Sequence, residues 1–418
     1  MVRYVIGRTV LHADINNCYA SIELLHHPKL RGHPVAVGGS VEERHGIILA
    51  RNYEARPFGI KVGQALWEAR AKCPRLIIVP PDYDKYLRFS RMFRNILYDY
   101  SQYIEPYGLD ESWVDVTGSL RLFGDGQSIA DKIRERVKFE LGITVSVGVS
   151  YNKIFAKLGS DIKKPDATTV ITEDNYRDIV WPLPAEDLLG VGRATQIKLA
   201  RLGIKTIGDI AKSDPKRLMK WLGKWGYFLY INANGLDKSP VAEFGEEKIV
   251  KSVGNSTTCP RDLENDEDAH IVFQDLAESV AERMRELGLK ARTVEVSLRD
   301  NKLFWLTRQS TLTRPTFVST ELCDTAMKLL RTNYKWDRPL RSVGIRGTNL
   351  VPMSTPYQLC LFEDETKHER LEKLEYAIDD IRRCYGHYAI DLAFMRLDPK
   401  LGKLNPKDDH TIHPISYL

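Results

Sequence analysis

The chain has 418 residues, which is long enough for about three or four domains. Its composition, 43% hydrophobic and 28% charged, is typical of a soluble folded protein and excludes an intrinsically disordered one. The formal net charge of +5 permits nucleic acid as a partner without requiring it.

The six cysteines are scattered and form no C-x-x-C pair, so neither a zinc site nor a disulfide framework is indicated. We expect reduced thiols and a cytoplasmic protein. No apolar run approaches membrane-spanning length, and Arg3 and Arg8 interrupt the N-terminal residues where a signal peptide would be apolar. The sequence therefore predicts no membrane association.

The first predicted strand covers residues 10–16 and carries Asp14, and a helix is expected over residues 19–25. Two short strands are predicted next, over residues 35–37 and 46–50.

The segment over residues 51–61 is rich in side chains that can contact phosphate, namely Tyr53, Arg56 and Lys61. Three such residues alone are explained at least as well by a solvated helix face.

The most informative stretch is residues 107–113, which places the adjacent carboxylates Asp110 and Glu111 between two predicted strands. Adjacent acids repel and raise each other's pKa. A divalent cation removes that cost, and hard oxygen ligands suit Mg²⁺. Asp14 is the candidate for a third ligand.

The surrounding order of strand, helix, hairpin, helix and strand predicts a two-layer α+β arrangement, with helices on one face of an antiparallel sheet. The later elements are expected over residues 84–103 (helix), 129–141 (helix) and 143–149 (strand). This arrangement would bring Asp14 beside Asp110 and Glu111 on adjoining strands.

Residues 150–165 carry Lys153 and Lys157 one helical turn apart, and Lys164 just before a proline. A lysine here could reach a triphosphate as a point charge. An ordinary exposed basic helix is the alternative.

Between residues 172 and 240 the chain suggests helices joined by glycine hairpins at residues 188–192 and 223–226. Such a hairpin can leave backbone N–H groups free to bind phosphate without reading bases. Three basic residues next to the first hairpin, Lys198, Arg201 and Lys205, strengthen this interpretation. A plain corner between two helices is the alternative.

After a charged linker over residues 241–250, residues 251–350 predict a β-α-β-β-α-β module. The strands are expected near residues 252–258, 293–298, 303–312 and 341–347, and the helices near 269–287 and 319–333. Arginines on the strands, Arg299 and Arg346 among them, could follow a duplex backbone or simply belong to a solvated sheet.

In the tail, residues 358–362 form a compact apolar peptide that begins with Gln358 and precedes an acidic run. Two apolar anchors and a glutamine suit capture in a partner's pocket, although the peptide could also pack on its own fold. A short amphipathic helix is expected over residues 371–381, without an assigned function.

Together these motifs resemble the Y-family of DNA polymerases, the translesion group, and are most similar to its bacterial DNA polymerase IV branch. The matching motifs occupy residues 12–23, 50–56, 108–111, and 148–153 running on to 164–165. They follow the family's order over about residues 8–362.

The resemblance implies an α+β right-hand polymerase with a ferredoxin-like palm, small fingers, a helical helix-hairpin-helix thumb and a β-α-β-β-α-β little finger. It maps the palm to residues 1–17 and 83–171, the fingers to 18–82, the thumb to 172–240, a linker to 241–249, the little finger to 250–350 and a tail to 351–418.

The resemblance also implies low-fidelity, template-directed DNA synthesis across damage, with two Mg²⁺ ions, replaceable by Mn²⁺, acting on a dNTP and a primer 3′-hydroxyl. Its metal ligands would be Asp14, the Ile15 carbonyl, Asp110 and Glu111. The triphosphate would be held by Asn17, Cys18, Tyr53, Arg56 and Lys164. Tyr19 occupies the position of the steric gate, where an aromatic ring leaves no room for a 2′-hydroxyl.

The expected partners are primer-template DNA, dNTPs and the sliding clamp (β subunit), bound by a monomer. The hairpin and the basic sheet predict DNA-backbone contacts for Gly190, Gly192, Lys198, Arg299 and Arg346, and the resemblance assigns clamp binding to Gln358, Leu361 and Phe362. Two features depart from the family: Cys18 stands where many relatives carry a large aromatic residue, and a long segment follows the clamp peptide.

Two other functions are compatible with parts of the sequence. A nucleotidyl cyclase also uses paired acids on a palm-like sheet, but it has no need of a hairpin thumb, a basic second module or a clamp peptide. A non-catalytic DNA-binding or clamp-docking scaffold would have no need of the three acids together with Tyr53, Arg56 and Lys164.

Overall fold

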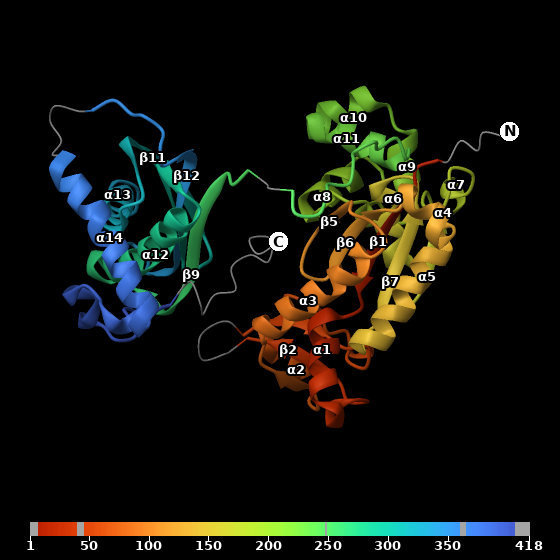
Figure 1. Ribbon diagram of the computed structural model, residues 1–418, viewed down its shortest axis with the longest axis horizontal. Helices are drawn as coiled ribbons and strands as arrows, with labels where there is room; N and C mark the ends of the chain where they lie inside the picture. The colour runs from red at the N-terminus through yellow and green to blue at the C-terminus, as the bar shows by residue number, and fades with distance from the viewer. Residues whose placement is uncertain (1–6, 40–45, 247–248, 360–364, 406–418) are drawn as a thin grey trace. The chain divides into compact units, whose positions relative to one another are not determined.

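The computed structural model describes residues 7–39, 46–246, 249–359 and 365–405. The described residues form two compact units, one of residues 7–38 and 47–246 and the other mainly of residues 249–359 and 365–405 (Figure 1). None of the helices in the described part of the chain has the length and apolar character needed to span a bilayer.

The main sheet of the first unit has five strands in the order β5-β6-β1-β7-β8. Strand β1 (Val10–Ile15) lies between β6 (Glu111–Asp115) and β7 (Val145–Ser150), and both pairings are antiparallel. The outer strands are β5 (Ile104–Pro106) and β8 (Thr168–Ile171). Because β8 runs parallel to β7, the prediction of a purely antiparallel sheet is wrong at this edge. Helix α6 (Lys153–Ile162) forms the crossover that a parallel pair requires.

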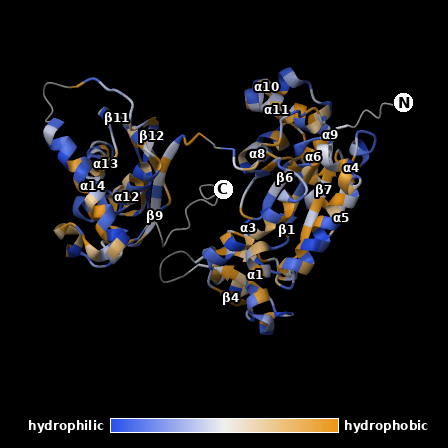
Figure 2. Ribbon diagram, in the orientation of Figure 1, coloured by the Kyte–Doolittle hydropathy of each residue, from blue (hydrophilic) through white to orange (hydrophobic). Residues whose placement is uncertain are grey.

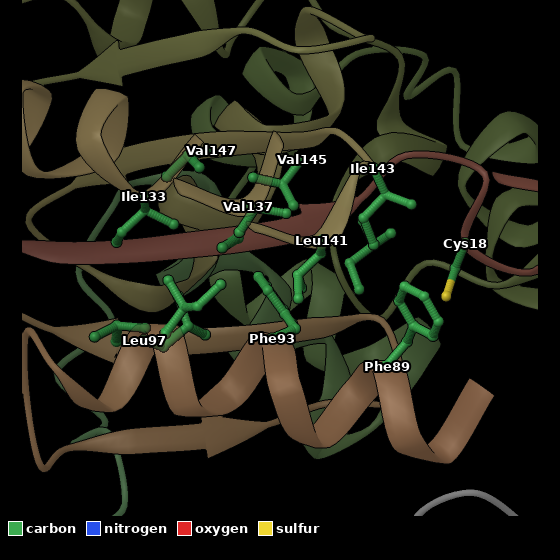
Figure 3. Packing of buried hydrophobic residues seen from close by; sticks show 14 of the residues in the cluster. Cys18, Phe89, Phe93, Leu97, Ile133, Val137, Leu141, Ile143, Val145 and Val147 are labelled. Atoms are coloured by element: carbon green, nitrogen blue, oxygen red, sulfur yellow. The ribbon is translucent and has the colours of Figure 1, made fainter. Parts of the chain in front are cut away.

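Two helices, α3 (Tyr83–Tyr98) and α5 (Gly126–Arg136), pack against one face of this sheet. Figure 3 shows Phe89, Phe93 and Leu97 directed from α3 toward Val145 and Val147 of β7. Figure 2 shows hydrophobic and hydrophilic residues together on α5, as expected for a helix with one face on a sheet.

Helix α6 covers the opposite face, so the prediction that helices cover a single face is wrong. Its approach depends on Gly148 of β7, where a Cβ atom would lie 1.9 Å from the Ala156 carbonyl oxygen. Only glycine permits this contact. The close approach brings the polar side of α6 over the strand residues that share a face with Gly148, including His12.

Helix α3 ends at Tyr98, five residues before the predicted end at Tyr103. The Tyr103 carbonyl accepts a hydrogen bond from the Asp115 amide at 3.1 Å, and residues 104–106 pair with β6. Residues near Tyr103 therefore pair with β6 instead of continuing the predicted helix. Helix α5 continues into a π-helical turn over Val137–Leu141, as far as the predicted end.

A smaller sheet in the same unit has the order β3-β2-β4 and its own small core. It consists of β2 (Val35–Gly38), β3 (Ile48–Arg51) and β4 (Ile77–Val79), with α2 (Leu66–Lys72) beside it. The remaining helices of the first unit are α1 (Cys18–His26), α4 (Leu120–Phe123), α7 (Tyr176–Ile179), α8 (Arg193–Arg201), α9 (Ile207–Lys212), α10 (Pro215–Leu222) and α11 (Lys224–Ala233).

Residues 241–246, expected to be a linker, pack on the first unit. Val241 is buried with Val10 and Trp113, and the Phe244 amide donates a hydrogen bond to the Gln102 carbonyl at 2.8 Å.

The second unit is the predicted β-α-β-β-α-β module, with an antiparallel sheet in the order β11-β10-β12-β9. Its strands are β9 (Ser252–Leu263), β10 (Leu289–Asp300), β11 (Trp305–Thr316) and β12 (Leu340–Pro352). Helices α12 (Asp266–Glu286) and α13 (Ser319–Asn333) share one core with this sheet and leave its other face open.

A third helix, α14 (Glu365–Tyr385), is longer than the sequence pattern predicted. Buried Arg285 of α12 contacts Glu375 at 2.7 Å and Asp379 at 2.6 Å, both on α14. Leu401 lies in the core of the second unit. Residues 365–405 are therefore part of this module.

His368 of α14 is a buried titratable group in that contact, with 1% of its side chain exposed. It lies 2.9 Å from Glu321 and 3.0 Å from Glu372. Burial alone would lower its pKa, but hydrogen bonds to the two carboxylates raise the pKa to about 9.

We expect the second unit to be less stable at pH 10 than at pH 6. Folded His368 keeps its proton up to about pH 9, whereas the unfolded residue loses it near 6.5. The stabilisation is complete below 6.5 and is lost as the pH rises through 9, with a cost of roughly 3 kcal/mol. Denaturant unfolding of the full chain checks this, and His368→Gln should flatten the pH profile. Identical profiles for the two proteins would contradict the prediction.

Candidate active site

Three carboxylates meet at one end of β1 and β6. Asp14 lies directly opposite Glu111 in the antiparallel register, so both side chains project from the α6 face. The Ile15 amide donates a hydrogen bond to the Asp110 carbonyl at 2.8 Å, which holds the tip of the hairpin against β1. The sequence expected these three acids to be neighbours, and the strand register makes them so.

Burial, together with the neighbouring carboxylates, raises the pKa of two of the acids. Burial raises the pKa of Asp14 to about 7, and Asp110 and Glu111 add to the rise, although Lys164 lies only 2.9 Å away. Burial and then Glu111 raise the pKa of Asp110 as well. A bound cation would favour the ionised forms, so the electrostatics of the cluster fit a cation site.

Glu111 is held differently. Burial would raise its pKa, but His12 and Lys157 outweigh this effect and lower the pKa to about 2. Lys157 forms a short ion pair with Glu111, and His12 Nε2 lies 3.4 Å from Glu111 Oε2. Glu111 is therefore a fixed negative charge at neutral pH.

Among the residues that the structure describes, no group of three or more His, Cys, Asp or Glu side chains is placed to hold a metal ion. Asp14 and Glu111 each contact a lysine instead, Lys164 and Lys157 respectively. The donors nevertheless fit by their chemistry, since carboxylate and carbonyl oxygens are the ligands that hard divalent cations take.

An open pocket of about 410 Å³ lies beside these acids. Its lining includes the predicted sugar-selecting residue Tyr19 and most of the residues predicted for metal and triphosphate binding, namely Asp14, Ile15, Asn17, Cys18, Arg56, Asp110 and Lys164. Glu111 and Tyr53, also predicted, are not among the lining residues. Leu49, Ala50, Arg51 and Val62 complete the lining. The pocket is thus formed by β1, the start of α1, the β3 segment and the loop after α6.

The cationic side of the pocket is ordered by contacts of Arg56. Its guanidinium lies 4.1 Å above the ring of Tyr53 and donates a hydrogen bond to Asn17 Oδ1 at 2.6 Å. Lys164 contacts both Asp14 and Asp161. Lys61, the third phosphate-capable residue of that segment, is exposed and does not line the pocket.

The Tyr19 side chain packs against a neighbouring aromatic ring. Its ring stacks on Tyr86 with centroids 4.3 Å apart and 7° between the planes. The Tyr86 hydroxyl donates to buried Glu23 at 2.8 Å. The neighbouring Cys18 is buried, and burial raises the pKa of its thiol. Cys18 therefore contributes volume to the pocket rather than charge.

Two residues were missed as partners of the acid cluster. His12 precedes Asp14 by two positions, and the two-residue period of a strand could have placed them on the same face. Lys157 was expected either to reach a triphosphate or to lie on an exposed basic helix, yet it contacts Glu111. No local sequence signal gives that contact, because it depends on how α6 packs on the sheet.

The first glycine hairpin differs from the prediction. Only a 3₁₀ turn, Ala185–Asp187, precedes it, and Gly192 caps the following helix α8, which carries Lys198. Gly190 has φ +96°, and its carbonyl accepts a hydrogen bond from Trp225 Nε1 at 2.9 Å. The second hairpin has the expected form, with Gly223 between α10 and α11.

The remaining predicted residues lie in the second unit. Arg299 and Arg346 are on the open face of its sheet, where Arg346 contacts Glu295 at 3.6 Å. Gln358 is exposed beyond the end of β12. Leu361 and Phe362 fall outside the described residues.

Comparison with known proteins gives matches along most of the chain. Residues 13–161 match the model of the impB/mucB/samB family, residues 250–361 match the C-terminal domain of that family, and residues 186–237 match a model described as the thumb domain of DNA polymerase-iota. A DNA polymerase IV from Acetivibrio thermocellus is 48% identical over 397 residues, 95% of this chain and 100% of the relative.

A less similar relative and a solved structure also carry DNA polymerase names. DNA polymerase IV 1 of Bacillus subtilis is 36% identical over 386 residues, which are 91% of each chain. A solved structure of a Y-family DNA polymerase chimera superimposes with a TM-score of 0.72 at 25% identity, covering 82% of this chain and 99% of that one.

Proposed function

The chain belongs to the impB/mucB/samB family and is a Y-family DNA polymerase of the bacterial DNA polymerase IV type, and we propose that the pocket beside Asp14, Asp110 and Glu111 is where it extends a primer. It is a DNA-directed DNA polymerase of the translesion group and depends on divalent metal ions. The observation that carries the site assignment is the cross-strand pairing of Asp14 with Glu111 beside Asp110.

We infer that the metal is Mg²⁺, bound as two ions by Asp14, Asp110, Glu111 and the Ile15 carbonyl, with Mn²⁺ able to replace it. When bound, the ions would neutralise charge on the reacting phosphate and lower the pKa of the primer 3′-hydroxyl. Phosphoryl transfer needs positioning and charge neutralisation more than covalent participation by the protein.

The chain's own residues supply the positioning. Lys164 and Arg56, both lining the pocket, would bind the triphosphate as cations, with Asn17 and Tyr53 orienting Arg56. Tyr19 would lie under the sugar and exclude a 2′-hydroxyl. No side-chain general base is required.

The wider assignments are also proposals. The first unit would hold the palm (1–17, 83–171), fingers (18–82) and thumb (172–240), and the second unit the little finger. Gly190, Gly192, Lys198, Arg299 and Arg346 would contact the DNA backbone, and the segment from Gln358 to Phe362 would bind a sliding clamp. The protein would act as a monomer in the cytoplasm.

Primer extension with controlled metal tests the site. Removing divalent ions with a chelator should abolish incorporation, because the charge of the three acids and the triphosphate is then uncompensated. Added Mg²⁺ or Mn²⁺ should restore incorporation. Ca²⁺ should support nucleotide binding but not incorporation, because its larger coordination sphere is poorly suited to the reaction. Extension that persists without divalent ions would overturn the proposal. Incubation with nucleotide alone, without a primer, should give no product.

A further inference from the structure

The turn between β10 and β11 exposes an unusual run of apolar side chains. Leu303, Phe304 and Trp305 are consecutive and are 54%, 62% and 52% exposed. Single exposed apolar residues are common, but a consecutive run at a turn is normally avoided unless it has a function.

Hydrogen bonds within the turn restrain its backbone. The Asp300 carboxylate accepts hydrogen bonds from the amides of Lys302 at 2.8 Å and Phe304 at 2.9 Å. Leu303 has φ +70°, a conformation that is strained for a bulky residue. A rigid, strained turn that displays aromatic residues is typical of a binding site rather than of a surface under no constraint.

The surroundings of the turn are basic. Trp305 lies opposite Arg299 in the strand register, and both are on the open face of the sheet, away from α12 and α13. Lys302 is exposed, and Arg338 is 56% exposed and lies 3.4 Å from the Asp300 carboxylate. The aromatic run is therefore bordered by cations at the edge of the face that carries Arg299 and Arg346.

We propose that Trp305, next to exposed Phe304 in the turn, forms a stacking platform for unpaired nucleotides of DNA whose backbone follows the open face. This inference rests on the proposed function, because it takes Arg299 and its neighbours as DNA contacts. Aromatic side chains beside cations bind single-stranded nucleic acid, since every base offers a face for stacking and every nucleotide a phosphate. The cations favour this partner over an uncharged apolar protein surface.

The test compares two exposed, size-matched substitutions in the full chain, Trp305→Leu and Trp305→Phe. Binding is measured by fluorescence anisotropy with a primer-template that has a long single-stranded 5′ overhang and with a blunt duplex of the same paired length. Loss of a stacking contact is expected to weaken overhang binding by about fivefold or more in Trp305→Leu. Trp305→Phe keeps a ring and should retain most of the affinity. Trp67→Ala, at a tryptophan that is 72% exposed on α2, controls for loss of an exposed indole.

The pattern of binding losses across the two substrates and the variants decides the test. A loss confined to the overhang substrate and to the leucine variant supports the platform. Equal losses on both substrates, or none on either, overturn it, as does a variant that binds DNA normally and loses only a protein partner. A wild-type protein that binds neither substrate would instead refute the proposed function. Thermal unfolding of each variant excludes loss of fold as the cause.

Discussion

Glu111→Ala should lower the rate of nucleotide incorporation by about a thousandfold or more while leaving primer-template affinity within about twofold. Glu111 stays ionised well below neutral pH, because His12 and Lys157 lower its pKa to about 2. Removing it takes away a proposed metal ligand and leaves the Lys157 ammonium without its carboxylate partner. The charge at the reacting centre would then have the wrong sign for holding a cation.

Single-turnover incorporation at saturating Mg²⁺ measures the effect, and anisotropy with labelled DNA measures the affinity. Glu140→Ala is a matched control, because that carboxylate is exposed and only pairs with Arg136 on the surface. Circular dichroism verifies the fold of both variants. A Glu111→Ala protein with normal turnover would remove this residue from the active site.

Tyr19→Ala should reduce discrimination against ribonucleotides by about a hundredfold, the scale at which a pocket rejects an added hydroxyl. The ring is held parallel to Tyr86, whose hydroxyl is bonded to buried Glu23, so it cannot move aside easily. The proposed gate is therefore supported by packed side chains, and truncation to alanine should open space beside the sugar.

The ratio of kcat/KM for a deoxynucleotide to that for its ribonucleotide checks this prediction. Tyr19→Phe retains the ring and should keep the ratio close to that of the unchanged enzyme. If alanine and phenylalanine behave alike, the ring does not select the sugar.

Sequence reasoning was most successful where the pattern is local. Asp110 and Glu111 lie in a short hairpin with alternating strand residues beside it, so their position at a strand end could be inferred. The β-α-β-β-α-β module was likewise predicted, because its strands and helices have distinct periods. The helix over 319–333 is found with the predicted ends.

The predictions are wrong where contacts between residues far apart in the sequence determine the structure. A helix covers the second face of the main sheet because α6 packs closely over Gly148. The sequence of neither segment alone predicts this contact. The pairing of Lys157 with Glu111 follows from that same packing.

The contact between α12 and α14 has a practical consequence for exchanging modules between relatives. A recombination point placed between β12 and α14 would take α14 from the other parent. Wherever that parent lacks acids at the positions of Glu375 and Asp379, the buried Arg285 guanidinium would be uncompensated, which is strongly destabilising. A hybrid enzyme should therefore inherit the whole C-terminal block from a single parent.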